Sequence, residues 1–259
     1  MVIVLFFWGV QSLAQPSPSL IYNMRLTPVA MTAFCALALP RQFAAAFSRG
    51  NSLAAVRRQF SSTPTGLLSV KEEVDPGVVE GTDLRVLKYP DPSLRAENAE
   101  CTEEELKDGT IGKIAKEMFM VMYAAEGVGL AAPQVGINKK LMVYNESGDK
   151  KKWLDEIVMA NPKIVEFSEA KDVEIEGCLS FPNMNGKVER SKWIKVEAQN
   201  LKGKKIKKKF KGWEARIFQH EYDHLDGVVY IDRLDEEDRS EVQPVLDELV
   251  DEFGEGGEL

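Results

Sequence analysis

The placement of the histidines constrains this chain more than any other feature. The 259-residue sequence has only two, His220 and His224, four residues apart in the segment His-Glu-Tyr-Asp-His. Positions four apart leave the same face of an α-helix, so both imidazoles can reach one metal ion. Glu221 lies beside that face, where its carboxylate can reach a water molecule and shuttle protons. The alternative is a surface helix that carries two histidines by chance.

A third metal ligand must come from another part of the chain. A catalytic tetrahedral site needs three protein ligands and one open position, and downstream of His224 the sequence offers only carboxylates. Upstream, Cys178 lies in the segment Glu-Gly-Cys-Leu-Ser, and its thiolate would be a strong ligand. The alternative for a lone cysteine is a small buried apolar side chain. Three scattered cysteines are too few for a disulfide framework, which indicates a reducing compartment.

The amino-terminal part of the chain differs in composition from the rest. Residues 1–70 contain five arginines but no lysine, aspartate or glutamate, a composition typical of organelle-targeting segments. A disordered tail, or a start codon at Met24 or Met31, is the alternative. The opening apolar run could also be the front half of a two-part plastid signal. We therefore expect a targeting segment and linker at 1–82, a folded catalytic domain at 83–254 and an acidic tail at 255–259.

The overall charge and hydropathy exclude some classes of partner. The net charge of −8 argues against a general nucleic-acid-binding protein, although one basic segment departs from it, and we expect no DNA partner. No apolar run approaches the length that spans a bilayer, so we expect no membrane segment.

The hydrophobic pattern predicts an α+β fold. A helical stripe from Ile111 to Met122, which we interpret as core-facing, is followed by a glycine at 127 that is placed to end the helix. Short strands are then expected at 140–144, 164–167, 172–176, 187–190, 193–198 and 205–210. Helices follow at 214–225 and, with Pro244 in its first turn, at 244–253. We expect mixed or antiparallel sheets packed around the central His-Glu-Tyr-Asp-His helix, with an N-terminal and a C-terminal helix.

Three separated segments resemble, in order and spacing, the three motifs of the peptide deformylase family. They are Gly-Val-Gly-Leu-Ala-Ala-Pro-Gln at 127–134, Glu-Gly-Cys-Leu-Ser at 176–180 and His-Glu-Tyr-Asp-His at 220–224. The similar region runs from about residue 84 to residue 253. The resemblance implies hydrolysis of the N-formyl group from the formyl-methionine of nascent proteins. It also implies one divalent metal ion, for which we expect Fe²⁺ first, with Zn²⁺ or Ni²⁺ as alternatives.

The resemblance also implies roles for individual residues. Cys178, His220 and His224 match the metal ligands, and Glu221 would pass the water proton to the leaving amine. The side-chain amide of Gln134 and the backbone N–H of Leu179 match the donors that stabilise the oxyanion.

The substrate site is predicted partly from geometry. Gly129 has no side chain, so a substrate backbone can approach the chain there. Ile217 and Trp213 lie one and two helical turns before His220, so with Val128 they would form an apolar pocket for the methionine side chain; core packing is an equal alternative for Trp213. We also expect Glu176 to orient a ligand histidine.

Formyl-methionine starts translation in plastids and mitochondria, which agrees with the arginine-bearing N-terminus. We expect a plastid first and a mitochondrion second, a monomer, and transient contact with the organellar ribosome. The rival functions are a zinc peptidase with the same helix and a catalytically silent ribosome-associated protein.

Lysines crowd the stretch from 202 to 211. Protection of an exposed edge strand is the interpretation that we favour, with contact to ribosomal RNA as the alternative.

Overall fold

The computed structural model describes residues 75–257; most of the predicted targeting segment, 1–74, and Cys35 lie outside the described residues. A five-stranded antiparallel sheet has the order β1-β2-β3-β6-β7, and a separate antiparallel pair is formed by β4 and β5. The strands are β1 (Gly129–Ala131), β2 (Leu141–Tyr144), β3 (Ile157–Phe167), β4 (Lys171–Cys178), β5 (Phe181–Ser191), β6 (Trp193–Gln199) and β7 (Lys205–Lys211).

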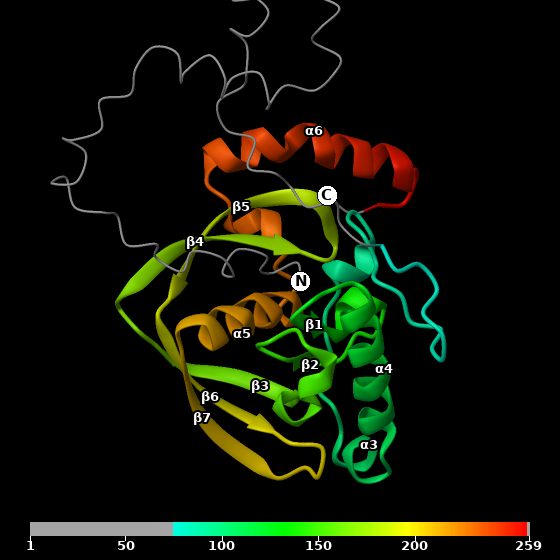
Figure 1. Cartoon of the computed structure of the whole chain (residues 1–259), viewed down its shortest axis with the longest axis vertical. Coiled ribbons are helices and arrows are strands. Elements are labelled where there is room, and N and C mark those ends of the chain that lie inside the picture. The colour runs from blue at the N-terminus through cyan, green and yellow to red at the C-terminus, as the bar shows by residue number, and fades with distance from the viewer. Residues whose placement is uncertain (1–74, 258–259) are drawn as a thin grey trace, which may run out of the picture. The chain divides into compact units, whose positions relative to one another are not determined.

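Among residues 75–257, the α-helices that accompany these sheets are α3 (Glu103–Lys107), α4 (Thr110–Ala124), α5 (Gly212–Leu225) and α6 (Glu236–Phe253). Short 3₁₀ helices are η4 (Pro92–Leu94), η5 (Ala132–Val135), η6 (Lys150–Asp155) and η7 (Tyr230–Arg233). Helix α5 lies between the two sheets, whereas α4 flanks β1 and β2 and α6 lies along β5 (Figure 1). The expected α+β fold around a central helix is confirmed, and both sheets are antiparallel.

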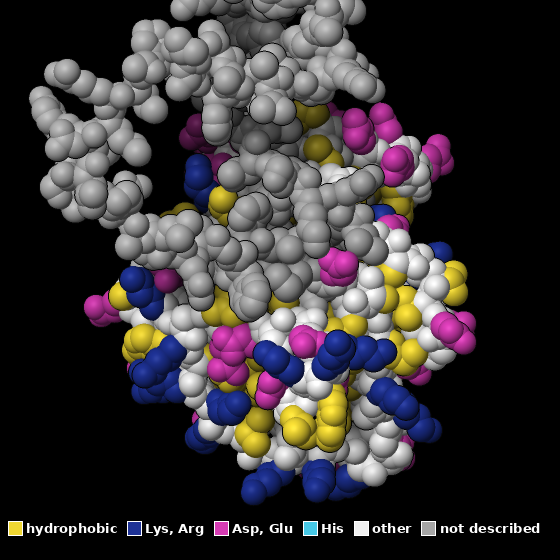
Figure 2. Space-filling model, in the orientation of Figure 1, with side chains coloured by type: hydrophobic (Ala, Val, Ile, Leu, Met, Phe, Trp, Pro, Cys, Tyr) yellow, Lys and Arg dark blue, Asp and Glu magenta, His cyan; other side chains and the backbone are white. Residues whose placement is uncertain are grey.

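The charged side chains are divided between opposite parts of the described chain. Acidic side chains gather over α6, whereas basic ones gather at the opposite end, over the hairpin of β6 and β7 (Figure 2). No described helix is long and apolar enough to cross a membrane.

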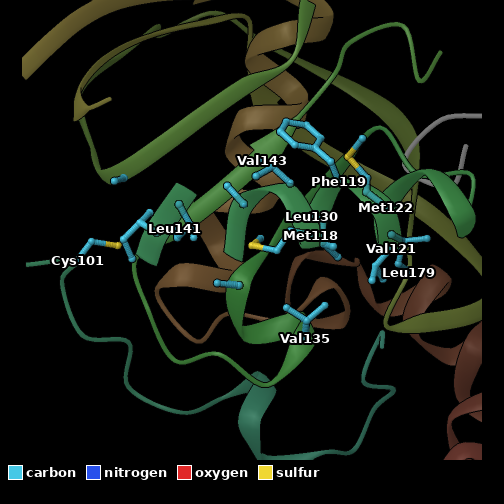
Figure 3. Packing of buried hydrophobic residues seen from close by; sticks show 14 of the residues in the cluster. Cys101, Met118, Phe119, Val121, Met122, Leu130, Val135, Leu141, Val143 and Leu179 are labelled. Atoms are coloured by element: carbon cyan, nitrogen blue, oxygen red, sulfur yellow. The ribbon is translucent and has the colours of Figure 1, made fainter. Parts of the chain in front are cut away.

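Three hydrophobic clusters hold these elements together. The first packs α4 against β1 and β2; Met118 and Met122 are fully buried in it, which confirms the predicted core-facing stripe (Figure 3). The second packs α5 against the inner face of the five-stranded sheet, and the third joins β5, η7 and α6. Leu179, Ile217 and Cys178 belong to the first, second and third cluster respectively, so the predicted site lies where the three clusters meet.

Some predicted boundaries were wrong. Helix α6 begins at Glu236, with Asp235 as its N-cap, so Pro244 lies inside the helix and not in its first turn. Helix α4 ends at Ala124, before Gly127. Strand β5 begins at Phe181, because its pairing with β4 outweighs the poor strand propensity of its proline and glycine.

Candidate metal centre and active site

Helix α5 positions the two histidines as the sequence predicts. His220 and His224 are buried on one face of this helix, with ring centroids 5.3 Å apart. Burial, together with the neighbouring His220, lowers the pKa of His224 well below its usual value. The neutral imidazole, which is the form that binds a metal, is therefore favoured.

Cys178 reaches the histidines from the end of β4. A register shift between Gly177 and Cys178 interrupts the β4–β5 ladder, and the fully buried Cys178 Sγ lies 3.3 Å from His224 Nε2. One ligand atom each from Cys178, His220 and His224 lie within 4.8 Å of one another. The structure thus brings together the three predicted ligands from segments that are more than 40 residues apart.

Glu176 fixes the orientation of His220. Its Oε2 lies 3.0 Å from His220 Nδ1, which directs the other ring nitrogen, Nε2, toward the centre. Burial alone would raise the pKa of Glu176, but the charge of Arg190 and the hydrogen bond with His220 hold it below its usual value. The ionised carboxylate accepts a hydrogen bond from Nδ1–H, which is the contact that the orienting role expected for Glu176 requires.

Two buried arginines that the sequence analysis missed hold Glu176 in place. Arg190 donates to both carboxylate oxygens, at 3.0 and 2.9 Å, and Arg216 Nη1 donates to Oε1 at 2.7 Å. Arg190 also bonds Asp223, and Arg216 bonds Asp172. Arg216 stands four residues before His220, so helical spacing could have placed it on the ligand face; no local pattern marks Arg190.

Glu221 is buried beside the ligands without a hydrogen-bond partner. Neither of its carboxylate oxygens, nor His220 Nε2 nor His224 Nδ1, has a partner among the described residues. Burial, followed by the negative charge of Glu176, raises the pKa of Glu221 well above its usual value. Buried polar atoms in native proteins are nearly always satisfied. The unpartnered His220 Nε2 and Glu221 carboxylate, in a cluster that holds a buried thiol, therefore fit a divalent metal ion and its water.

Gly129 makes room for this carboxylate. A Cβ atom at position 129 would lie 2.3 Å from Oε1 of Glu221 and 2.9 Å from its Cδ. The structure thus shows a requirement for glycine at position 129 that the sequence did not reveal, because the missing side chain leaves space for Glu221. This requirement is separate from the predicted approach of a substrate to the backbone of Gly129.

The predicted oxyanion donors both belong to residues next to Cys178. Gln134 Oε1 accepts a hydrogen bond from the backbone N–H of Ala131 at 2.9 Å. That bond turns its Nε2 toward Ser180 Oγ, at 3.2 Å, and Cys178 Sγ, at 3.6 Å. Leu179 follows Cys178 directly and is buried. The amide nitrogen of Gln134 therefore lies beside the thiol of Cys178, and its role as an oxyanion donor stays a prediction.

The residues expected to form the methionine pocket belong to one cluster. Val128 and Ile217 are both buried in the second hydrophobic cluster, and Trp213 packs against it. Trp213 also donates from Nε1 to the backbone oxygen of Glu146 at 3.3 Å. Trp213 thus shows the packing that was its alternative, together with a hydrogen bond to the loop after β2, and the methionine pocket stays a prediction.

Comparison with known proteins identifies the family. The family model described as polypeptide deformylase matches residues 83–240. The chain belongs to the polypeptide deformylase family. The motif resemblance is thereby confirmed, and the buried thiol and imidazoles form the candidate site of a metal-dependent family.

Relatives of this family share the sequence and the fold. The rice protein named peptide deformylase 1B, chloroplastic, is 43% identical over 66% of this chain and 62% of its own length. The Arabidopsis thaliana protein named peptide deformylase 1B, chloroplastic/mitochondrial, is 39% identical over 67% of this chain and 62% of its own length. The chain thus spans about three fifths of these two relatives. The crystal structure of Plasmodium falciparum peptide deformylase is 42% identical, with a TM-score of 0.63, and the match covers 65% of this chain and 96% of that one.

Proposed function

We propose that this protein hydrolyses the N-formyl group from the N-terminal formyl-methionine of nascent polypeptides and releases formate. The observation that carries the proposal is the convergence of Cys178, His220 and His224 beside the buried, unpartnered carboxylate of Glu221. Membership of the polypeptide deformylase family supports the choice of substrate.

Cys178, His220 and His224 would hold one divalent metal ion, which supplies a Lewis acid that makes water nucleophilic near neutral pH. Fe²⁺ is our first proposal, with Zn²⁺ or Ni²⁺ as alternatives, since a thiolate and two imidazoles accept all three. Glu176 keeps the proton of His220 on Nδ1, which would leave Nε2 free to bind the ion.

Glu221 would move the proton of the reaction. Its carboxylate takes a proton from the attacking water and delivers it to the leaving amine, which cannot depart as an anion. Burial without a hydrogen-bond partner supports this role, because it raises the pKa of Glu221 well above its usual value and so makes the carboxylate a better proton acceptor.

Gln134 and Leu179 would stabilise the oxyanion of the tetrahedral intermediate. The Nε2 group of Gln134 already points toward the ligand thiol, and the N–H of Leu179 belongs to the residue next to that ligand. Donors held in place before the reaction cost no reorganisation when charge develops. Val128, Gly129, Ile217 and Trp213 would bind the formyl-methionine.

The next proposals concern the domains of the chain, its location in the cell and its oligomeric state. We propose targeting and linker residues at 1–82, a catalytic domain at 83–254 and an acidic tail at 255–259; the family match at 83–240 supports the second. The plant relatives' names support an organelle, with a plastid as our first proposal and a mitochondrion as the second. We also propose a monomer that meets formylated chains at the organellar ribosome.

The substrate test uses formyl-Met-Ala-Ser and its unformylated counterpart with the full chain under anaerobic conditions. We expect formate from the first peptide and intact Met-Ala-Ser from both. Internal cleavage of either peptide would instead support the zinc peptidase. A metal-loaded protein that processes neither would support the catalytically silent one.

A further inference from the structure

The hairpin of β6 and β7 carries a concentration of positive charge that the proposed chemistry does not use. Residues 192–211 contain nine lysines and one glutamate, in a chain whose net charge is −8. Strand β7 is the edge of the five-stranded sheet. The predicted edge strand is thus present, and lysines on it can protect that edge from pairing with another chain.

The strand register divides these lysines between two faces. Residues with even numbers, such as Ile206 and Phe210, face the cluster beneath α5. The odd-numbered lysines of β7 therefore share the outer face, where all four are exposed: Lys205, Lys207, Lys209 and Lys211. Their register partners on β6 are Gln199, Glu197, Lys195 and Trp193, and Figure 2 shows the basic side chains over this hairpin.

Few carboxylates neutralise this outer face. Glu197 pairs with Lys207 at 2.5 Å, and Glu166 pairs with Lys195 at 2.6 Å. Lys205, Lys209 and Lys211 form no salt bridge with any described residue, so three charges of the row remain available to an anionic partner.

An aromatic ring lies within the lysine row. The ammonium group of Lys209 is 3.5 Å from the centroid of the Trp193 ring, and that of Lys195 is 5.8 Å from it. Proteins bind unpaired nucleotides by combining lysines, which contact the phosphates, with an aromatic side chain nearby on which a base stacks. Stable attachment to a membrane would instead need an apolar face that inserts between lipids.

We infer that the outer face of the β6–β7 hairpin, formed by Lys205, Lys209, Lys211 and Trp193, docks on RNA through its phosphates and an unpaired base. The choice of RNA rests on the proposed function, because nascent formylated chains emerge from an RNA-rich particle. The acidic helix α6 lies away from this hairpin (Figure 1), which would turn the acidic part of the protein away from the RNA.

The test measures the binding of a fluorescent 20-nucleotide RNA stem-loop to the full chain by anisotropy across a salt series. The variant Lys205→Gln/Lys209→Gln/Lys211→Gln removes the three available charges. The control, Lys150→Gln/Lys151→Gln/Lys152→Gln, removes the same charge from three exposed lysines of η6. The hairpin variant should bind at least about 10-fold more weakly, and its slope of log K against log salt should fall by about 2 to 3, since each lost phosphate contact removes about 0.7 to 0.9.

Two results would overturn the inference: equal loss in the hairpin and control variants, or binding to phosphatidylserine vesicles without binding to RNA. Formate release from formyl-Met-Ala-Ser should be unchanged in both variants, which also shows that they fold. An RNA-binding chain with no formate release would refute the proposed function and leave the docking surface standing.

Discussion

Replacing Gly129 by alanine tests whether this glycine exists to place Glu221. The added Cβ would lie 2.3 Å from Oε1, whereas ordinary van der Waals contact begins at 3.4 Å, so the carboxylate must move by about 1 Å. Such overpacking costs about 1–3 kcal/mol of stability, and a catalytic group displaced by about 1 Å loses about 10²-fold in rate. A 10²-fold loss corresponds to about 2.7 kcal/mol of transition-state stabilisation.

The assay follows kcat for formate release, metal content and the free energy of unfolding. Gly129→Ala should keep its metal and lose about 10²-fold in kcat. Gly112→Ala is the matched control, because a Cβ there meets nothing within 4 Å and the residue lies inside α4. It should keep full activity and gain about 0.5–1 kcal/mol in stability.

A double-mutant cycle separates displacement of Glu221 from general damage. If Gly129→Ala acts only by moving this carboxylate, it should have little further effect in a Glu221→Ala background. Additive losses, or wild-type kcat in Gly129→Ala, would refute the reasoning.

Three further predictions concern the surroundings of the site. Gln134→Glu keeps an oxygen that accepts from the N–H of Ala131 but removes the Nε2 donor. The kcat should fall by about 10²–10³-fold with metal content unchanged. An unchanged kcat would show that Gln134 has no part in the mechanism. Arg216→Met removes a buried cation from Glu176 and should lower the free energy of unfolding, measured by denaturant titration, by up to about 3–5 kcal/mol. The control is Arg233→Met: because the Arg233 side chain is 44% exposed, its loss should cost less than about 1 kcal/mol. Equal costs for the two variants would contradict this prediction. Burial raises the pKa of the Cys101 thiol from 9.0 to about 11. The folded state therefore keeps this proton more tightly than the unfolded state, and the free energy of unfolding should fall between pH 9 and pH 11. In Cys101→Ala the free energy of unfolding should fall less steeply with pH, and identical slopes in the two proteins would contradict the prediction.

Long periodic elements could be predicted from the sequence, and short or irregular ones could not. The apolar stripe of α4 and the histidine spacing of α5 are local patterns, and both helices are present. Strand β1 has only three residues and is recognisable only through its pairing with β2. The first half of β5 contains Pro182 and Gly186, so its strand character depends on β4, which lies earlier in the chain.

In the site, too, the residues in local patterns could be predicted from the sequence, and the contacts between distant elements could not. The ligand types and Glu221 could be read from motifs, because helical spacing fixes how His220 and His224 converge. The clamp of Arg190 and Arg216 on Glu176 joins β4, β5 and α5, and no local pattern records a contact between three elements. The need for glycine at position 129 also became visible only when β1 was placed against α5.

The most direct test of the central claim combines anaerobic metal analysis with formate release for wild type, Cys178→Ser and Glu221→Ala. The wild type should carry about one metal ion per chain and release formate. Cys178→Ser should lose or change its metal, whereas Glu221→Ala should keep the metal and lose nearly all activity. An unchanged metal ratio in Cys178→Ser, or full activity in Glu221→Ala, would contradict the account.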